Sequence, residues 1–459
     1  MPSSLLDNLT RVASQHATGE IWIAYSGGMD SRVLLQLAVE AGLNREGRLR
    51  AVHIHHGLQA QADGWAQHCR SVCEQLGVEL QVRQVQVDAG NSLENQARIA
   101  RYRVFESLLA EGDLLLQGHH ADDQAETLLL RLMRGSGVRG LAAIPESRPL
   151  GRGQLLRPLL ACSRQRLADY AAERQLRWIE DPSNLDTRHD RNYLRAQVLP
   201  QLKQRWPGAV ASLGLSARNS AAAQHLCQEL AVIDLQRCLQ SDAGLSIAAL
   251  RQLSMARRDN LLRYWLQVLT GVLPDAALLQ RLWLELVDAR TDAQPQMRLG
   301  VRWLRRFEAG LYLLPELTEG AAGQVWGWKI APNRSSELWL PGGRLQSEPV
   351  IGSGLALPEM GLLQVSLRRG GERIRLQGRT GSRSLKKLLQ ERGVAPWQRS
   401  QLPLLYAGER LLAVADLWLA EGCLAAPGQP GIQLRWEPQA VPLRVPLRMP
   451  ESAPGDDDF

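Results

Sequence analysis

The segment Ser26–Ser31, Ser-Gly-Gly-Met-Asp-Ser, combines residue types that suit a phosphate-binding loop. It joins the apolar run Ile21–Tyr25 to the apolar run Val33–Leu35, which predicts a buried strand, a turn and a helix. Such a turn directs backbone N–H groups and the positive end of the helix dipole at an anion. Glycines allow the backbone to approach closely and serines donate hydroxyl groups. We therefore expect an anion to be bound by Ser26, Gly27, Gly28, Met29, Asp30 and Ser31, with Asp30 also able to hold Mg²⁺.

Three carboxylates, Asp122, Asp123 and Glu126, follow the apolar run Leu114–Gln117. One interpretation is a helix N-cap, because acids in a first turn complement the helix dipole. The other is a functional site. In a parallel sheet of strand order 3-2-1-4-5 the first and fourth strands are neighbours, so Asp30 and the acids would meet in one crevice. Glu126 lies one turn beyond Asp122, and such a pair can receive a cation or take a proton from an attacking ammonium.

A predicted helix over Leu93–Ala110 carries Arg98, Arg101 and Tyr102 on adjoining parts of one face. Two arginines beside a tyrosine suit a phosphate and a stacked base. The alternative is a solvated helix face with an ion pair between Glu94 and Arg98.

Histidines end the predicted second strand at His53, His55 and His56. Strand alternation places His53 and His55 on the same side. Zinc binding is one interpretation, but it would need further cysteine or carboxylate ligands, and no cluster of these lies nearby. The other interpretation is that the histidines pack in the core or line a nucleotide pocket. The sequence leaves the role of these histidines open.

The composition is that of a soluble globular protein, with 45% hydrophobic and 22% charged residues. No apolar run approaches the roughly 18 residues of a membrane span, and no basic end followed by an apolar run opens the chain. Six scattered cysteines without a Cys-x-x-Cys pattern indicate a reducing cytoplasm. The net charge of +7 comes mainly from arginine, which suits a nucleic-acid partner but also follows from a GC-rich genome.

Alternating strand and helix patterns predict a doubly wound parallel α/β domain over residues 1–215. A mainly helical domain with a hairpin or linker is expected over 216–350, and a small α+β domain over 355–440. Residues 449–459 are rich in Pro and Asp, which predicts disorder.

These motifs together resemble the tRNA(Ile)-lysidine synthetase family of PP-loop ATP pyrophosphatases. The chain lacks the Gly-x-x-x-x-Gly-Lys-Ser/Thr pattern of γ-phosphoryl transfer, whereas Ser-Gly-Gly-x-Asp-Ser is similar to the PP-loop. The resemblance is close to complete over residues 15–205 and weakest over 215–350. The matching segments are Ser26–Ser31, Val52–Leu58, His119–Thr127, Arg131–Gly137, Trp178–Asn184, Asp190–Arg195 and Gly371–Tyr406.

The resemblance implies that ATP adenylates O2 of the wobble cytidine of a tRNA(Ile) with a CAU anticodon. Pyrophosphate leaves, and the ε-amine of L-lysine then displaces AMP at C2. The product base, lysidine, pairs with A instead of G and changes the tRNA's identity from methionine to isoleucine. A homodimer is left open.

Carried over to this sequence, the resemblance implies that the loop residues bind ATP with Mg²⁺, and that Asp30 and Asp123 hold the metal. Lysine would be handled by Asp122, Asp123 and Glu126. RNA or phosphate would be contacted by Arg98, Arg101, Arg191 and Arg195.

Nine basic residues and two acidic ones lie between Arg368 and Arg392. Since this stretch has no aromatic residue, we expect it to contact the tRNA backbone rather than stack on bases, through Arg379, Arg383, Lys386 and Lys387. A solvated basic face is the alternative.

Two other functions compete with lysidine formation. A PP-loop tRNA thiolase generally needs reactive or cluster-binding cysteines, and none lies in the loop or acidic motifs. A non-catalytic nucleotide- or RNA-binding module would not need the intact glycines and acids. Pyrophosphate release that depends on tRNA and lysine would separate the three.

Overall fold

The computed structural model describes residues 9, 18–44, 47–57, 61–86, 93–290, 293–316, 324–331, 333–356, 362–377, 381–439 and 441–445. The chain divides into two compact units, one of Met1–Glu229 with Arg448–Phe459 and one of Leu230–Leu447. Arg379 and the tail 449–459, both subjects of predictions above, lie outside the described residues.

A six-stranded sheet of order β3-β2-β1-β4-β6-β5 forms the centre of the first unit. The first five strands in this order are parallel, and β5 runs antiparallel to β6 at the edge. The predicted neighbours 3-2-1-4 are therefore present, and a short hairpin supplies the rest of the sheet. The strands are β1 (Ile21–Ala24), β2 (Leu49–His55), β3 (Glu79–Gln84), β4 (Leu114–Leu116), β5 (Ser147–Leu150) and β6 (Gly153–Leu156).

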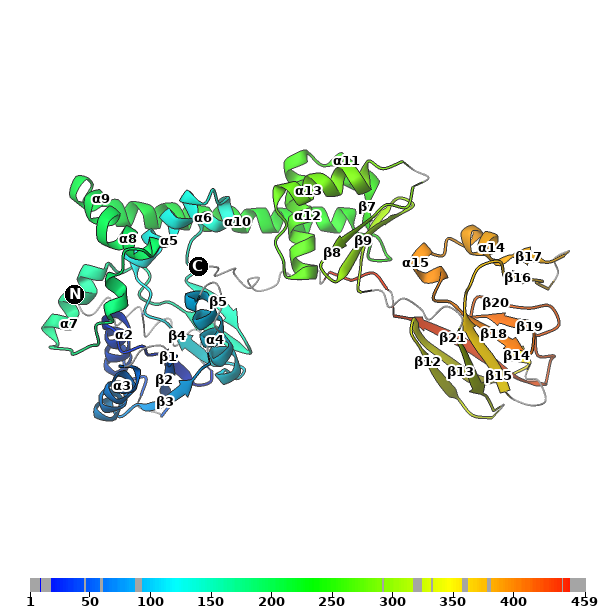
Figure 1. Ribbon diagram of the computed structural model, residues 1–459, viewed down its shortest axis with the longest axis horizontal. Coiled ribbons are helices and arrows are strands. Elements are labelled where there is room, and N and C mark those ends of the chain that lie inside the picture. Colours follow the sequence, from blue (N-terminus) through cyan, green and yellow to red (C-terminus); the bar gives the residue numbers. More distant parts are fainter. Residues whose placement is uncertain are drawn as a thin grey trace. The chain divides into compact units, whose positions relative to one another are not determined.

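Apolar side chains on both faces of this sheet are buried, as in doubly wound folds. Ile21 and Ile23 of β1 belong to one core, while Trp22 points into the other and packs near Phe105. Figure 1 shows α2 and α3 on one side of the sheet and α4 on the other. The helices are α2 (Met29–Glu40), α3 (Ala62–Leu76), α4 (Leu93–Leu108), α5 (Ala121–Met133), α6 (Val138–Leu141) and α7 (Arg164–Glu173).

A chain of short helices follows the sheet and leads into the long α10 (Ala209–Cys238). Leu213 and Ala217 of α10 pack with Leu128 of α5, so the start of α10 is fixed on the first unit. The short helices are η1 (Pro182–Leu185), α8 (Asp190–Tyr193), the π-helical turn η2 (Leu194–Val198) and α9 (Leu199–Arg205).

The first part of the second unit packs three helices and a π-helical turn against a four-stranded sheet of order β7-β10-β9-β8. Its core includes the fully buried Trp265 and Leu311. The elements are β7 (Leu245–Ser246), α11 (Ile247–Gln252), α12 (Met255–Thr270), α13 (Ala276–Leu282), η3 (Trp283–Val287), β8 (Gln296–Leu299), β9 (Arg302–Phe307) and β10 (Gly310–Leu314).

Two further sheets, of orders β11-β15-β18-β19-β20 and β12-β13-β21-β14, share one apolar core in the rest of the second unit (Figure 1). The elements are β11 (Val325–Lys329), β12 (Ser336–Leu340), β13 (Gly343–Ile351), β14 (Leu355–Ala356), β15 (Leu362–Leu367), β16 (Arg373–Ile374), β17 (Arg383–Ser384), α14 (Leu385–Glu391), α15 (Pro396–Arg399), β18 (Pro403–Ala407), β19 (Arg410–Val414), β20 (Trp418–Leu419) and β21 (Pro430–Pro438).

The pairing of these strands bears on the domain boundary. β11 pairs with β15 and β13 pairs with β21, so residues 325–351 share backbone hydrogen bonds with the C-terminal sheets. The sequence placed them with the middle domain. We therefore propose that the C-terminal domain starts before β11 rather than near residue 355.

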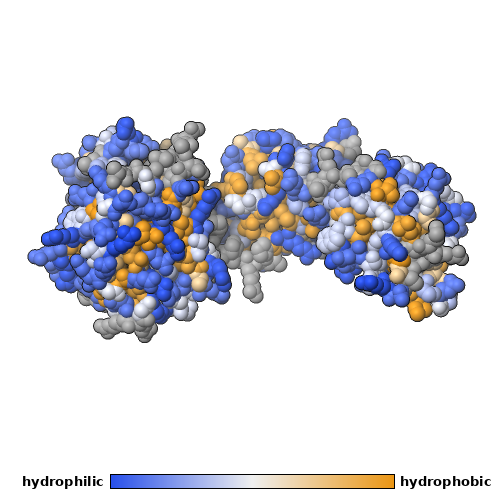
Figure 2. Space-filling view, turned by 60° about the horizontal axis from the view of Figure 1, so that its bottom comes forward, coloured by the Kyte–Doolittle hydropathy of each residue, from blue (hydrophilic) through white to orange (hydrophobic). Residues whose placement is uncertain are grey.

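Among the described residues no helix is long and apolar enough to cross a membrane. Hydrophilic side chains cover much of the face seen in Figure 2.

Candidate active site

The phosphate loop connects β1 to α2 and depends on Gly27. This residue has φ +88°, and a Cβ there would lie 2.6 Å from Cδ1 of Ile179. The backbone N–H of Ile179 donates to the Gly27 carbonyl at 2.9 Å, which ties the loop to the segment after α7. Only glycine meets both the backbone conformation and the close approach.

Two serines brace the loop from inside. The hydroxyls of Ser26 and Ser31 lie 3.0 Å apart, and the Ser31 hydroxyl donates to the Gly28 carbonyl at 3.0 Å. Gly28 is the N-cap of α2 and has no side chain to accept from the first helical turn. The N–H groups at this helix start therefore suit an anionic ligand.

His53 supports the loop from the end of β2. Its Nδ1 lies 2.9 Å from the Tyr25 carbonyl, and the ring is buried. Burial lowers the pKa of His53, so a neutral ring donates this hydrogen bond. His55 instead contacts Asp63 at 3.1 Å, and burial followed by the charge of Arg101 lowers the pKa of His56 to about 4. The part of the chain that the structure describes holds no group of three or more His, Cys, Asp or Glu arranged for a metal ion.

The start of α5 lies against the phosphate loop. A Cβ on Gly118 would fall 3.0 Å from the backbone carbon of Asp30, so the chain passes the start of α2 at close range. His120 is the N-cap of α5 and forms a capping box with Asp123. The backbone N–H of His120 donates to Asp123 Oδ2 at 3.0 Å, and the backbone N–H of Asp123 donates to His120 Nδ1 at 3.3 Å. The cap that the sequence allowed is thus part of the site.

His120 connects the loop to the acids. Because its Nδ1 accepts from a backbone N–H, the neutral ring carries its proton on Nε2. This atom lies 3.6 Å from Asp30 Oδ2 and 3.5 Å from Asp123 Oδ2. Burial opposes a charge on the ring, but the nearby carboxylates of Asp30 and Asp123 raise the pKa of His120. The structure therefore brings Asp30 and Asp123 to one histidine, as the strand order led us to expect.

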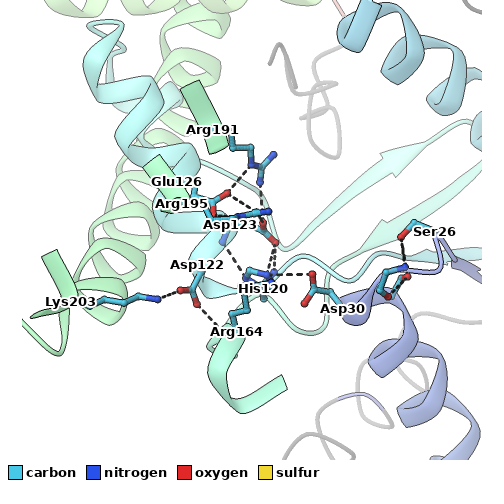
Figure 3. Close-up of polar contacts among 12 residues, drawn as sticks. Ser26, Asp30, His120, Asp122, Asp123, Glu126, Arg164, Arg191, Arg195 and Lys203 are labelled. Carbon is cyan, nitrogen blue, oxygen red and sulfur yellow. Dashed lines mark hydrogen bonds and ion pairs between the residues drawn. The ribbon is translucent and has the colours of Figure 1, made fainter. Parts of the chain in front are cut away.

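Two arginines cover Asp123 and Glu126 (Figure 3). Arg191 reaches Glu126 Oε2 through Nε at 2.9 Å and Asp123 Oδ1 through Nη2 at 3.1 Å. Arg195 reaches Glu126 Oε1 through Nε at 2.7 Å and Asp123 Oδ1 through Nη2 at 3.0 Å. Although burial disfavours ionisation of Asp123, His120 and the arginines hold the pKa of its carboxyl well below the usual range. The sequence had assigned Arg191 and Arg195 to RNA or phosphate.

Asp122 faces away from this group (Figure 3). Its Oδ2 accepts from the backbone N–H of Arg164 at 2.8 Å, and its Oδ1 pairs with the ammonium of Lys203. Burial alone would raise the pKa of Asp122, but the contacts with Arg164 and Lys203 outweigh it and lower the pKa. Asp122 thus links α5 to the first residue of α7 and to α9. The sequence did not single out Lys203, whose partner lies far away along the chain.

His119 is held by a buried arginine. Arg157 Nε donates to His119 Nδ1 at 3.2 Å, and Arg157 Nη1 donates to the Pro145 carbonyl at 2.7 Å. Burial, and then the charge of Arg157, lowers the pKa of His119 to about 3. His119 is therefore a neutral ring at physiological pH.

The basic face of α4 is built around Tyr102. The guanidinium carbons of Arg98 and Arg101 lie 5.2 and 5.9 Å from the centre of its ring, and that of Arg148 lies 4.9 Å away. Arg148 comes from β5 and was not identified from the sequence. The ring is thus a cation–π partner of arginines from two elements.

Three family models match the chain. A PP-loop domain matches residues 2–202, a TilS substrate binding domain matches 245–312, and a TilS substrate C-terminal domain matches 363–436. A tRNA(Ile)-lysidine synthase of Pseudomonas aeruginosa is 45% identical over 95% of this chain and 98% of its own length. The chain belongs to the tRNA(Ile)-lysidine synthase family. Enzymes of the same name from Pseudomonas putida and Yersinia pestis are 46% and 44% identical over 91% and 93% of the chain and 95% of each relative.

Membership of the lysidine synthase family confirms the resemblance seen in the motifs, including the middle region where the motifs were weakest. It also confirms the α/β fold class of the first domain, the use of ATP and the class of enzyme. A solved U34-tRNA thiolase from Methanococcus maripaludis is 16% identical, with a TM-score of 0.38 over 48% of this chain and 79% of its own, which says nothing about function.

In the C-terminal region matched by the family, part of the basic cluster is compensated. Arg375 pairs with Glu421, and Arg383 lies 3.8 Å from Glu391. Lys386 and Lys387 are exposed on α14. The guanidinium of Arg392 lies 5.5 Å from the ring of Trp418. The fold thus brings an aromatic residue to a basic stretch that has none of its own.

Proposed function

We propose that this enzyme adenylates the wobble cytidine of tRNA(Ile) with a CAU anticodon and then joins lysine to C2 of the base, forming lysidine. Family membership over nearly the whole chain supports the reaction. The single observation that carries the placement of the site is the meeting of Asp30, on the phosphate loop, with His120 and Asp123 at the start of α5.

The first step needs the triphosphate of ATP on the loop, with its α-phosphorus facing cytidine O2. The open N–H groups at the start of α2 and the hydroxyl of Ser26 suit the phosphates. The O2–phosphorus bond forms as the bond to pyrophosphate breaks. Charge builds up on the leaving pyrophosphate, and the N–H groups at the start of α2 are suited to stabilise it.

Mg²⁺ fits beside Asp30. Its Oδ1 is buried without a hydrogen-bond partner among the described residues, and one carboxylate with substrate phosphates is a common set of magnesium ligands. When bound, Mg²⁺ neutralises phosphate charge. The oxygens of Asp123 are occupied by arginines and by the His120 backbone, so we propose Asp30 rather than Asp123 as the protein ligand.

In the second step the ε-amine of lysine attacks C2, the C2–O2 bond breaks, and AMP leaves with the oxygen. The amine must lose a proton, for which carboxylates are suitable acceptors. We propose that Asp123 and Glu126 receive the lysine ammonium. We assign Asp122 to holding α7 and α9 in place, because its oxygens already have partners there.

Binding of tRNA falls to basic groups around and beyond this site. We propose phosphate contacts for Arg98 and Arg101 on α4 and for Arg379, Arg383, Lys386 and Lys387 of the C-terminal domain. None of the six cysteines, all of which the structure describes, forms a disulfide, which supports a reducing cytoplasm. Burial raises the pKa of Cys69, which lies beside the loop at Gly27, and that of Cys73 to about 12, which does not suit a thiolase. A homodimer remains a prediction, which a light-scattering measurement of the molar mass in solution can test.

The direct test uses the purified chain with ATP, lysine and a tRNA(Ile) transcript that carries the CAU anticodon. We expect lysine on the wobble cytidine and release of pyrophosphate and AMP. In the first turnover pyrophosphate release should need only ATP and tRNA, whereas lysine incorporation and AMP release should need all three substrates. A methionine tRNA transcript with the same anticodon is the control and should not be modified. Pyrophosphate release without incorporation of labelled lysine would reject lysidine formation.

A further inference from the structure

Asp123 and Glu126, the acid pair, have few unoccupied acceptor positions. Glu126 is fully buried, and each of its oxygens accepts from Arg191 or Arg195, the arginine pair. Both arginines also bond Oδ1 of Asp123. A substrate ammonium that is to bind the acid pair must therefore first displace a guanidinium.

The arginine pair is more accessible than the acids it covers. The side chains of Arg191 and Arg195 are 33% and 31% exposed, against 10% for Asp123 and 0% for Glu126. They come from α8 and η2, short elements that follow the long connection after α7. A partly exposed side chain on a short element can change partners, whereas the acids are fixed on α5.

The phosphate loop lies near the arginine pair, on the other side of His120. His120 lies close to both Asp123 and Asp30, and the charge of Asp30 acts on Arg195. Guanidinium groups bind phosphate at least as well as carboxylate, through the same two-pronged geometry. A triphosphate on the loop would offer the arginine pair a second anionic partner close to the first.

We propose that the arginine pair moves from the acid pair to the phosphates of bound ATP, and that this exchange opens the lysine site. Lysine then binds well only after the nucleotide, because the ammonium takes the place that the guanidiniums leave. The exchange rests on the proposed function in one respect, the assignment of lysine to the acid pair. It adds an order of binding and gives Arg191 and Arg195 a positioning role.

The first test needs no variant. Equilibrium dialysis measures the affinity of the full chain for labelled lysine alone and with an ATP analogue that has a methylene group between the α- and β-phosphorus. We expect the analogue to tighten lysine binding at least about tenfold, and lysine to tighten analogue binding by the same factor. Equal lysine affinity with and without the analogue would overturn the exchange.

The second test removes one arginine. Arg191→Gln leaves an uncompensated charge on the acid pair, so nucleotide-free lysine binding should tighten about fivefold and the effect of the analogue should shrink. Arg188→Ala is the matched control, because Arg188 is 89% exposed and pairs with Asp186 instead. Thermal unfolding checks that each variant is folded.

Loss of lysine binding in a folded Arg191→Gln variant, with or without the analogue, would mean that this arginine contacts lysine itself, and the exchange would be rejected. Should Arg191→Gln not fold, the wild-type comparison still decides. Failure of the proposed function looks different: the wild-type chain would then make no lysidine, whatever the order of binding.

Discussion

Gly118 and Asp30 approach so closely that a Cβ on Gly118 would lie 3.0 Å from both the carbonyl carbon and the carbonyl oxygen of Asp30. Backbone cannot give way as a flexible side chain can. Gly118→Ala should therefore push the start of α5 away from the loop, cost about 1–3 kcal/mol of stability and reduce kcat/KM more than about tenfold. Urea unfolding and steady-state kinetics measure the two effects. Gly137→Ala is the control, because a Cβ there meets nothing within 4 Å; equal behaviour of the two variants would contradict the prediction.

Asp30→Ala should abolish pyrophosphate release and leave tRNA affinity within about threefold, because phosphate-site and RNA contacts are largely separate. Pyrophosphate release and filter binding of tRNA measure the two quantities. Asp169→Ala, which removes an exposed carboxylate on α7, is the control and should change neither. A parallel loss of tRNA binding in Asp30→Ala would show that the loop also holds RNA.

His119 should make the protein less stable in mild acid. Burial and the charge of Arg157 give the folded ring a pKa of about 3, whereas a histidine in an unfolded chain titrates near 6.5. Between these values the unfolded state binds more protons, so the free energy of unfolding falls as the pH drops below about 6.5, by at most ~1.4 kcal/mol per pH unit.

Urea unfolding at pH 7.5 and pH 5.5, for the wild type and for His119→Asn, isolates this contribution. The Asn oxygen can still accept from Arg157 but does not titrate. We expect the variant to lose less stability between the two pH values. Its slope should not vanish, because His56 also has a lowered pKa, of about 4. Identical slopes would show that His119 is not responsible.

Reversing Arg383, Lys386 and Lys387 to Glu should raise KM for tRNA at least about tenfold and lessen the salt dependence of binding, with KM for ATP and lysine nearly unchanged. Lys387→Glu can be compared with Lys329→Glu, since both residues are exposed lysines. Only the former should weaken tRNA binding. An unaltered KM and salt slope in the folded triple variant would remove α14 and the strand before it from tRNA binding.

The strand, turn and helix around the phosphate loop could be predicted from the sequence because each leaves a local signal, and the neighbouring β1 and β4 followed from the strand order of doubly wound folds. Apolar runs of strand length end in glycine, and helix starts follow at once. The partners of the acids leave no such signal. Arg191 and Arg195 meet Glu126 only after the chain has passed through β5, β6, α7 and a long connection, so the motif Asp190–Arg195 indicated importance but not contact.

The pairing between strands that are distant along the chain also could not be predicted from the sequence. The sequence placed residues 325–350 within the middle domain and its hairpin or linker, and nothing local specifies that the partners of β11 and β13 are β15 and β21. The contact between Arg392 and Trp418 likewise joins residues that are distant along the chain, so no local pattern predicts it. Such contacts are fixed by the packing of the whole domain.

The pairing of β13 with β21 has a consequence for synthesis. The sheet of the first unit needs no strand beyond β6, so it can close while most of the protein is still to be translated. β13 pairs along its full length with β21, which leaves the ribosome last among the strands. At about 5–20 residues per second, β13 waits several seconds for that partner. We expect the nascent C-terminal domain to be the segment that depends on chaperones, and chains cut before β21 to aggregate through the open edge of β13.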